Sequence, residues 1–219
     1  MPKRDVSDFF DSYASDFNAI YGNRNTLLNN LINKLFRKSM RVRYIRTIEG
    51  CEPIEGRSVI DIGCGPGHYG VALAKKGAAR VCGIDFAESM IDLAKSRAVR
   101  SGVADRCSFF LGDFWDYPAE EKFDYAIVMG FMDYIEDPRE LIERVLSLTS
   151  HKAFFSFPSA SGFLAWQRRL RYRKRCDLFM YDLGQLYDLF EGTGYQKIHL
   201  EKINRDYFVT VSMAKEGRI

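Results

Sequence analysis

A short segment of this chain combines an acidic residue with closely spaced glycines. Residues 58–70 read Ser-Val-Ile-Asp-Ile-Gly-Cys-Gly-Pro-Gly-His-Tyr-Gly, so that Asp61 is followed by Gly63, Gly65 and Gly67. The apolar residues before the glycines predict a short buried strand, and the glycines predict a tight turn with positive φ and no Cβ in the way of a ligand. We therefore expect a nucleotide-like cofactor to lie against this turn.

Two kinds of cofactor fit the spacing. Read from Gly65, the segment contains Gly-x-Gly-x-x-Gly, and Asp85 lies 20 residues further on, as in dinucleotide-binding proteins. Asp61 favours a different ligand, because a carboxylate at the strand end attracts a cationic amino acid group and repels a pyrophosphate. A third interpretation is a strand-to-helix turn in which the glycines serve packing alone.

The pattern acid-x-Gly-x-Gly-x-Gly resembles the first motif of the class I S-adenosylmethionine-dependent methyltransferases, and the resemblance covers about residues 57–157. It implies that the glycine backbone contacts the methionine part of S-adenosylmethionine, that Asp61 lies next to its ammonium group, and that Asp85 binds the ribose hydroxyls. The other cofactor contacts that it implies are Phe86 and Met90 on the adenine, Asp113 and Phe114 at the adenine edge, and Met129 and Gly130 under the sulfonium.

The rest of the chain supports an α/β fold. Five predicted β/α units are followed by two strand-like runs, 195–203 and 207–213, with no helix between them, so one of these runs must be antiparallel. We predict a Rossmann-like doubly wound sheet of about seven strands with a C-terminal antiparallel β-hairpin. The class I methyltransferases have this layout, whereas a dehydrogenase more often continues with β/α units or adds a domain.

Composition places the 219 residues in one ordinary domain, since 47% are hydrophobic and 28% are charged. We divide it into an N-terminal helical cap, a cofactor-binding core, a lid-like insertion, and a C-terminal helix and hairpin. The corresponding ranges are 1–50, 57–157, 158–180 and 181–219.

Charge, hydropathy and cysteine usage exclude several classes of protein. A net charge of +3 argues against a polycation built for nucleic acid. No apolar run approaches the length that spans a bilayer, and the N-terminus does not resemble a signal peptide, so we expect a cytoplasmic protein. Five widely spaced cysteines without a Cys-x-x-Cys pair indicate neither a disulfide framework nor a metal site.

The N-terminal segment suggests a cover for the cofactor. Residues 9–21 are similar to the opening helix of small-molecule methyltransferases such as the magnesium-protoporphyrin and ubiquinone-pathway enzymes, and by this likeness Tyr13 closes over the cofactor. A second predicted helix, about residues 25–49, carries several cations, including Arg43 and Arg46. We interpret these cations as a solvated face, with a basic wall near an acidic substrate as the alternative.

A basic stretch after the fifth predicted strand is a candidate for substrate binding. It places six cations between Arg168 and Arg175 and is interleaved with aromatic residues. Three interpretations stay open: a lid that binds an anionic small-molecule acceptor, a peripheral contact with a membrane surface, or a solvated helix. In the first, the contacts come from Arg168, Arg171 and Tyr172.

Methyl transfer depends mainly on positioning two reactants and excluding water. If the acceptor is a hydroxyl, Asp133 and Tyr134, just past the fourth predicted strand, are our catalytic candidates. His151, expected before the fifth strand, and His199, within the sixth, are poorly placed. The chain lacks the Asn-Pro-Pro-Tyr-type signature of amino methyltransferases, which favours an oxygen or carbon acceptor. The alternatives are an NAD(P)-binding oxidoreductase and a non-catalytic regulatory protein that binds S-adenosylmethionine.

Overall fold

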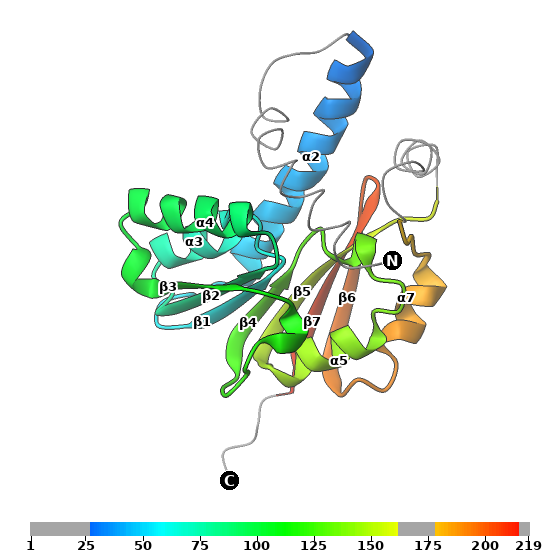
Figure 1. The fold of residues 1–219 in the computed structure, drawn as a ribbon. Helices are drawn as coiled ribbons and strands as arrows, with labels where there is room; N and C mark the ends of the chain where they lie inside the picture. The colour runs from blue at the N-terminus through cyan, green and yellow to red at the C-terminus, as the bar shows by residue number, and fades with distance from the viewer. Residues whose placement is uncertain (1–26, 162–177, 215–219) are drawn as a thin grey trace.

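A seven-stranded β-sheet forms the centre of the computed structural model, which describes residues 27–161 and 178–214 (Figure 1). The strands lie in the order β3-β2-β1-β4-β5-β7-β6, and β7 is antiparallel to both of its neighbours. The predicted doubly wound sheet with its C-terminal antiparallel hairpin is thus confirmed. The strands are β1 (Ser58–Ile62), β2 (Arg80–Asp85), β3 (Cys107–Leu111), β4 (Phe123–Val128), β5 (Thr149–Pro158), β6 (Tyr195–Ile203) and β7 (Asp206–Met213).

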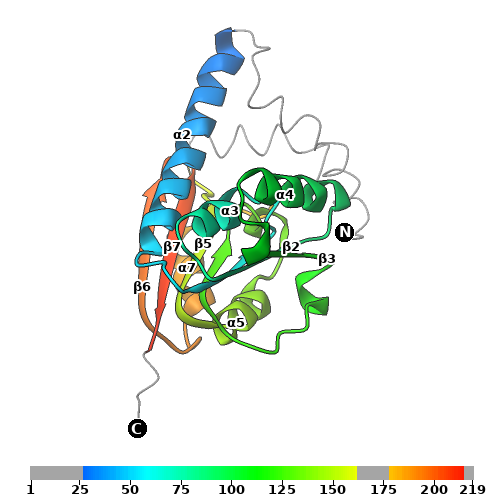
Figure 2. The ribbon, with the colours of Figure 1, turned by 90° about the vertical axis from the view of Figure 1, so that its left-hand side faces the viewer.

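Helices cover both faces of the sheet (Figure 1). The first face carries α2 (Leu27–Gly50), α3 (His68–Lys75) and α4 (Glu88–Arg100), and the second carries α5 (Arg139–Ser147) and α7 (Leu183–Phe190). Short 3-10 helices are η1 (Ala104–Arg106), η2 (Phe114–Asp116) and η3 (Met132–Tyr134). Helix α2 runs beside β6 and β7 and extends beyond the edge of the sheet (Figure 2). None of the helices in the described ranges is long and apolar enough to cross a membrane.

The central strands are apolar on both faces, which is what coverage by helices on both sides requires. Along β5, Phe154 packs with Phe208 on the face of α2 and α3, whereas Phe155 and Phe157 pack against Phe190 of α7. Because successive side chains of a strand point to opposite faces, one strand supplies both halves of the core. Because β5 is buried on both faces, its position in the sheet is well fixed. This also fixes the point at which the chain leaves the end of the strand.

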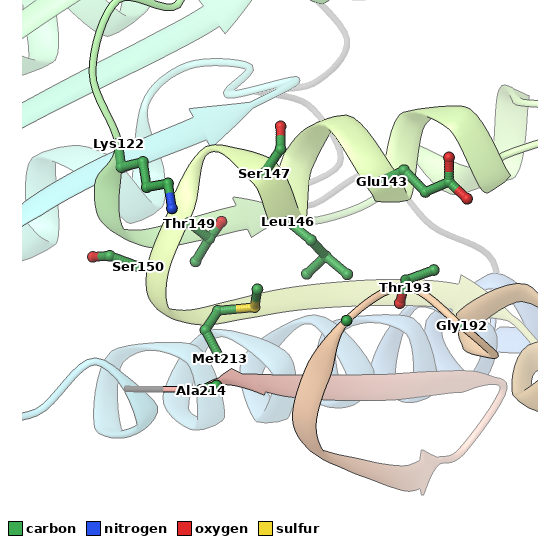
Figure 3. A pocket seen from close by; sticks show the side chains of 11 residues that line it. Lys122, Glu143, Leu146, Ser147, Thr149, Ser150, Gly192, Thr193, Met213 and Ala214 are labelled. Atoms are coloured by element: carbon green, nitrogen blue, oxygen red, sulfur yellow. The ribbon is translucent and has the colours of Figure 1, made fainter. Parts of the chain in front are cut away.

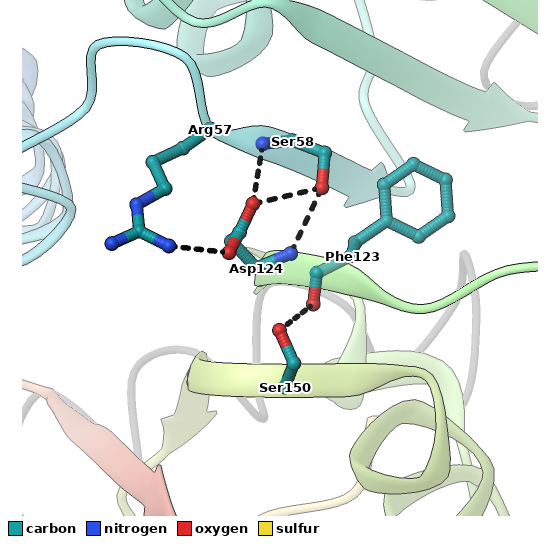
Figure 4. Close-up of polar contacts among 5 residues, drawn as sticks. All are labelled: Arg57, Ser58, Phe123, Asp124 and Ser150. Carbon is teal, nitrogen blue, oxygen red and sulfur yellow. Dashed lines mark hydrogen bonds and ion pairs between the residues drawn. The ribbon is translucent and has the colours of Figure 1, made fainter. Parts of the chain in front are cut away.

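A carboxylate at the start of β4 joins the amino-terminal ends of β4 and β1 (Figure 4). Asp124 accepts hydrogen bonds from the Ser58 N–H at 2.8 Å and from the Arg57 guanidinium at 2.9 Å, and Ser150 donates to the Phe123 carbonyl at 3.2 Å. Burial raises the pKa of Asp124, but the bonds from Ser58 and Arg57 outweigh it and hold this pKa below its usual value. These contacts set the register of β1 against β4.

Two local predictions differ from the structure. Strand β5 begins at Thr149, so His151 lies inside it rather than before it. The first residues of β5 are polar and part of them is exposed, so their pattern hid a strand that backbone pairing with β4 and β7 continues. The sequence Asp137-Pro138 predicts Asp137 as the N-cap of the next helix, whereas Pro138 holds this position in α5. The Asp137 carboxylate still accepts a hydrogen bond from the Arg139 N–H at 3.2 Å.

The sheet also determines where a ligand can bind. The strand order runs outward in opposite directions from β1 and β4, and connections from parallel strands leave at their carboxyl ends. In open α/β sheets the crevice at this point of reversal is the usual ligand site. The glycine-rich turn after β1 and the loop after β4 both lie at this point.

Candidate active site

Three glycines after β1 form a left-handed turn. Gly63, Gly65 and Gly67 have φ values of +66°, +51° and +72°, which other residues adopt only with strain. A Cβ on Gly63 would lie 2.6 Å from the ring of Phe131, whereas a Cβ on Gly65 would meet no atom of the described residues within 4 Å. Gly63 therefore allows the loop after β4 to pack on the turn, and Gly65 leaves open space beside it.

The Asp85 carboxylate, at the end of β2, holds this turn in place. It accepts hydrogen bonds from the Gly65 N–H at 2.8 Å and from the Ala87 N–H at 3.0 Å. A carboxylate has about four lone-pair sites, so these two bonds alone do not exhaust its capacity to accept hydroxyl donors. Asp85 therefore positions the glycine turn, a role that the sequence did not predict, and is chemically suited to a diol.

Asp61 is a buried carboxylate under the same turn. It is 2% exposed and accepts a hydrogen bond from the Gly70 N–H at 3.2 Å. Burial raises the pKa of Asp61 to about 7; the Gly70 N–H lowers it, and the nearby negative charge of Asp85 raises it. None of the described residues brings a cation close enough to offset this effect. Such a group gains from a cationic ligand, which restores its charged form.

The loop after β4 forms the opposite wall. Gly130 has a φ of +73°, and within the part of the chain that the structure describes a Cβ on it would meet nothing within 4 Å. Its N–H donates to the hydroxyl of Ser156 on β5 at 2.8 Å. Gly65 and Gly130 thus leave open space at the ends of neighbouring strands, and two acids, Asp61 and Asp85, lie on the β1 and β2 side.

The predicted catalytic pair lies just past this wall, in η3. Asp133 is 5% exposed and Tyr134 is half-buried. The chain returning from residues 162–177 passes beside them, because the Phe179 N–H donates to the Asp133 carbonyl at 3.0 Å and the Tyr181 hydroxyl donates to the Ile135 carbonyl at 2.9 Å. The structure thus brings this pair near the loop of Gly130; a role in catalysis stays a prediction.

Residues assigned to the adenine lie in different surroundings. Asp113 caps η2 by accepting a hydrogen bond from the Trp115 N–H at 3.0 Å. Phe114 is 2% exposed and packs in the core with the Arg144 guanidinium 5.1 Å from its ring centre, whereas Trp115 is 43% exposed. Trp115, which is not among the predicted site residues, is therefore the exposed aromatic side chain of η2.

The other two adenine residues, Phe86 and Met90, form a small cluster at the start of α4. Met90 is 2% exposed and Phe86 is half-buried. Met129 packs partly buried on the face of α2 and α3. The contacts of these three residues with a cofactor stay predictions.

Several predicted site residues cannot be placed, because Tyr13, Arg168, Arg171 and Tyr172 lie outside the described residues. Of the cations on α2, Arg46 is exposed and pairs with Glu201 at 3.1 Å, whereas Arg43 is 13% exposed. Neither a solvated face nor a basic wall describes Arg43.

A cavity of about 500 Å³ lies at the opposite end of the parallel strands, between the end of α5, the start of β5 and the end of β7 (Figure 3). Leu146 and Met213 point toward one another across it. Since it contains none of the residues of the glycine turn, it is not the site described above.

Comparison with known proteins identifies relatives by sequence. The methyltransferase domain family matches residues 54–179, which is more than half of the chain. A ribosomal protein L11 methyltransferase of Aeromonas hydrophila is 39% identical over 114 residues, covering 52% of this chain and 36% of the relative. A ubiquinone biosynthesis O-methyltransferase of Coxiella burnetii is 32% identical over 120 residues, covering 53% of this chain and 49% of the relative. The chain thus spans half or less of the length of these relatives.

Comparison of structures extends the likeness to nearly the whole chain. The magnesium protoporphyrin IX methyltransferase of Synechocystis PCC 6803, solved with bound SAH, has a TM-score of 0.78 and 19% sequence identity, covering 97% of this chain and 100% of that one. A structure of the same enzyme holds SAM. At this level of identity the likeness shows the fold. The family match, and not this likeness, favours the adenosyl cofactor over a dinucleotide as the ligand of the glycine turn.

Proposed function

Because this chain belongs to the methyltransferase domain family, we propose that it transfers a methyl group from S-adenosylmethionine to an oxygen or carbon nucleophile of a small-molecule acceptor. The observation that carries the proposal is the space that the described residues leave open beside Gly65 and Gly130; the Asp85 carboxylate holds the Gly65 N–H, and the Asp61 carboxylate is buried near the end of β1. A side chain at either glycine would project into this space, so the residues present fit a ligand that lies close to the backbone.

In this proposal each acid binds a different part of the cofactor. The buried Asp61 carboxylate attracts the ammonium group, since an opposite charge favours its ionised form. Asp85 accepts hydrogen bonds from the ribose hydroxyls while holding the Gly65 N–H. The backbone of the glycine turn lies against the methionine part, and Met129 and Gly130 lie under the sulfonium.

The protein contributes mainly by orientation and by excluding water. When bound, the cofactor supplies a methyl group on a sulfonium, whose leaving group is a neutral thioether. Asp133 and Tyr134 are assigned to the acceptor, where Asp133 accepts the proton of a hydroxyl and Tyr134 orients the nucleophile by hydrogen bonding. Both lie in η3, in the loop that follows β4 and Gly130.

The proposed acceptor is an anionic metabolite, sugar or lipid-linked compound. Its support comes from the cations between Arg168 and Arg175 in the sequence. Two of the similar proteins are named for ubiquinone biosynthesis and for magnesium protoporphyrin IX, and the third for a ribosomal protein. An acceptor with a carboxylate or phosphate group fits both the basic stretch and the small-molecule relatives.

A thermal-shift experiment tests the cofactor. The midpoint should rise with S-adenosylmethionine and S-adenosylhomocysteine and stay constant with NADH and NADPH. A ligand at a hundred times its Kd adds about 2.7 kcal/mol, which moves the midpoint by roughly 5 to 10 °C for a domain of this size. The shift should vanish in Asp85→Ala and persist in Asp105→Ala, an exposed acid far from the turn. A shift with NADH or NADPH alone would refute the proposal.

A labelling experiment tests the acceptor class. Tritiated methyl S-adenosylmethionine is incubated with the protein and a cell extract separated into small-molecule and macromolecular fractions. We expect label in anionic small molecules and none above background with Asp133→Asn. Label confined to protein or RNA would contradict the acceptor class. Tight cofactor binding without transfer to either fraction would favour the non-catalytic alternative.

A further inference from the structure

A buried polar network joins α2 to the loop of Gly130. We call it the Arg43 network; it consists of the side chains of Ser39, Arg43, Ser156 and Asp206. Ser39 donates to the Asp206 carboxylate at 2.7 Å, and the Arg43 guanidinium lies 3.8 Å from the same oxygen. The same Arg43 nitrogen donates to the Ser156 hydroxyl at 3.0 Å, and this hydroxyl also accepts the Gly130 N–H at 2.8 Å.

We propose that Arg43 is a positioning residue for methyl transfer, because it orients the Ser156 hydroxyl that holds the loop after β4. The proposal rests on the proposed function only for its effect on the cofactor, and its structural part stands by itself. It assigns to one cation of α2 a role that is neither contact with solvent nor contact with the acceptor.

The geometry of a hydroxyl explains how the effect is transmitted. A serine oxygen has two lone pairs, and in Ser156 they accept from Gly130 and from Arg43. The rotation of the hydroxyl is thereby fixed, with one lone pair directed at the Gly130 N–H. Without the guanidinium one of the two constraints on this rotation is lost, so the hydroxyl holds the Gly130 N–H less firmly.

The bond to Gly130 in turn sets the orientation of a peptide group at the site. The peptide unit between Met129 and Gly130 is planar, so the direction of its N–H fixes the opposite direction of the Met129 carbonyl. Gly130 has a φ of +73° and no side chain to hold it. Ser156 therefore supplies the constraint that a glycine lacks, in the loop assigned to the wall under the sulfonium.

Burial makes the network sensitive to the loss of one member. The side chains of Arg43 and Asp206 are 13% and 3% exposed, and Ser156 is 1% exposed. Removing Arg43 alone takes a cation away from a buried carboxylate, and breaking a buried ion pair destabilises a protein strongly. A test therefore needs a variant in which both charges are removed together.

The experiment measures the Gly130 amide and the cofactor in the same variants. Arg43→Met combined with Asp206→Asn removes both charges of the Arg43–Asp206 pair together, and Ser156→Ala removes the hydroxyl. Ser156→Thr keeps the hydroxyl, and Arg46→Ala is the matched control, since it lies one turn further along α2 in an exposed ion pair. Hydrogen exchange at Gly130 is followed by NMR in the free protein, and the Kd for S-adenosylhomocysteine by calorimetry.

We expect exchange at Gly130 to accelerate by about fivefold or more in both disrupting variants, the ratio for loss of one hydrogen bond. The Kd should rise by a similar factor, whereas Ser156→Thr and Arg46→Ala should stay within about twofold of the wild type. Unchanged exchange at Gly130 in the Arg43→Met, Asp206→Asn variant would overturn the proposal. If the wild type does not bind S-adenosylhomocysteine, the proposed function fails, while the exchange result still decides the role of Arg43.

Discussion

Replacing Asp61 with asparagine should stabilise the free protein at neutral pH and weaken its binding of the cofactor. The reason is burial, which raises the pKa of Asp61 from 3.8 to about 7 in the folded protein. Between these pH values the folded protein holds a proton that the unfolded chain has released. The contribution of Asp61 to the free energy of unfolding is therefore full below about pH 4 and is lost as the pH rises to about 7.

The magnitude follows from the size of this pKa difference. One pKa unit corresponds to about 1.4 kcal/mol, so at pH 8 the ionised carboxylate lowers the free energy of unfolding by up to about 4 kcal/mol. Asparagine has a similar shape, and its carbonyl oxygen can still accept the Gly70 N–H. We expect Asp61→Asn to be more stable than the wild type at pH 8 and equal to it near pH 4.

The assay is urea unfolding of the free proteins at several pH values, with Asp124→Asn as a control of opposite sign. The pKa of Asp124 is held below its usual value by Ser58 and Arg57, so Asp124→Asn should be destabilised at neutral pH and approach the wild type in acid. A lower stability of Asp61→Asn than of the wild type at pH 8 would refute our account of the buried carboxylate.

The same titration should appear in ligand binding. An ammonium group binds the ionised form of Asp61, which is half populated near pH 7 and about a tenth populated at pH 6. The wild type should bind S-adenosylhomocysteine about fivefold more tightly at pH 7 than at pH 6. Asp61→Asn should bind weakly at both pH values, without this change. Equal pH dependence in the two proteins would show that another group causes it.

Two further predictions concern the glycine turn and its neighbour. Gly63→Ala should lower the free energy of unfolding by about 3 kcal/mol, because its Cβ would lie 2.6 Å from the Phe131 ring. Gly65→Ala should cost about 1 kcal/mol of backbone strain but weaken binding of S-adenosylhomocysteine at least tenfold. Chemical denaturation measures the effect on stability, and calorimetry measures the effect on binding. Burial and a neighbouring guanidinium lower the pKa of His68 from 6.5 to about 4, so its contribution to stability is lost as the pH falls through this window. His68→Gln should gain stability relative to the wild type as the pH falls from 6.5 to 4.5, and a constant difference in urea unfolding would contradict this pKa.

Local patterns were sufficient to predict most of the fold and part of the site. Short runs of apolar residues that end in glycine or aspartate predicted β1, β2 and the turn between β1 and α3. Both signals, the apolar run and the glycines with positive φ, can be read from neighbouring residues. The antiparallel hairpin followed from the absence of a helix between its strands. These features were predictable since each is specified by residues that are close to one another in the sequence.

Contacts between distant residues could not be predicted in this way. The bond from Arg43 to Ser156 joins positions 113 residues apart, and Arg43 lies among several cations that have the same local pattern. The contact between Gly63 and the Phe131 ring likewise depends on the adjacency of β1 and β4. The sequence contains a pattern that could have indicated Trp115, an aromatic residue shortly after Asp113, the acid that follows β3. Phe114 fits this pattern equally well.

The position of β7 has a consequence for the synthesis of the protein. Strand β7 lies between β5 and β6 in the sheet but follows β6 in the chain. Strand β6 therefore has no strand to pair with in the described sheet until β7 is made. A nascent chain that has emerged from the ribosome through β6 can assemble the β3-β2-β1-β4-β5 part but carries an unattached strand. The insertion of β7 between β5 and β6 is therefore the step that completes the described sheet.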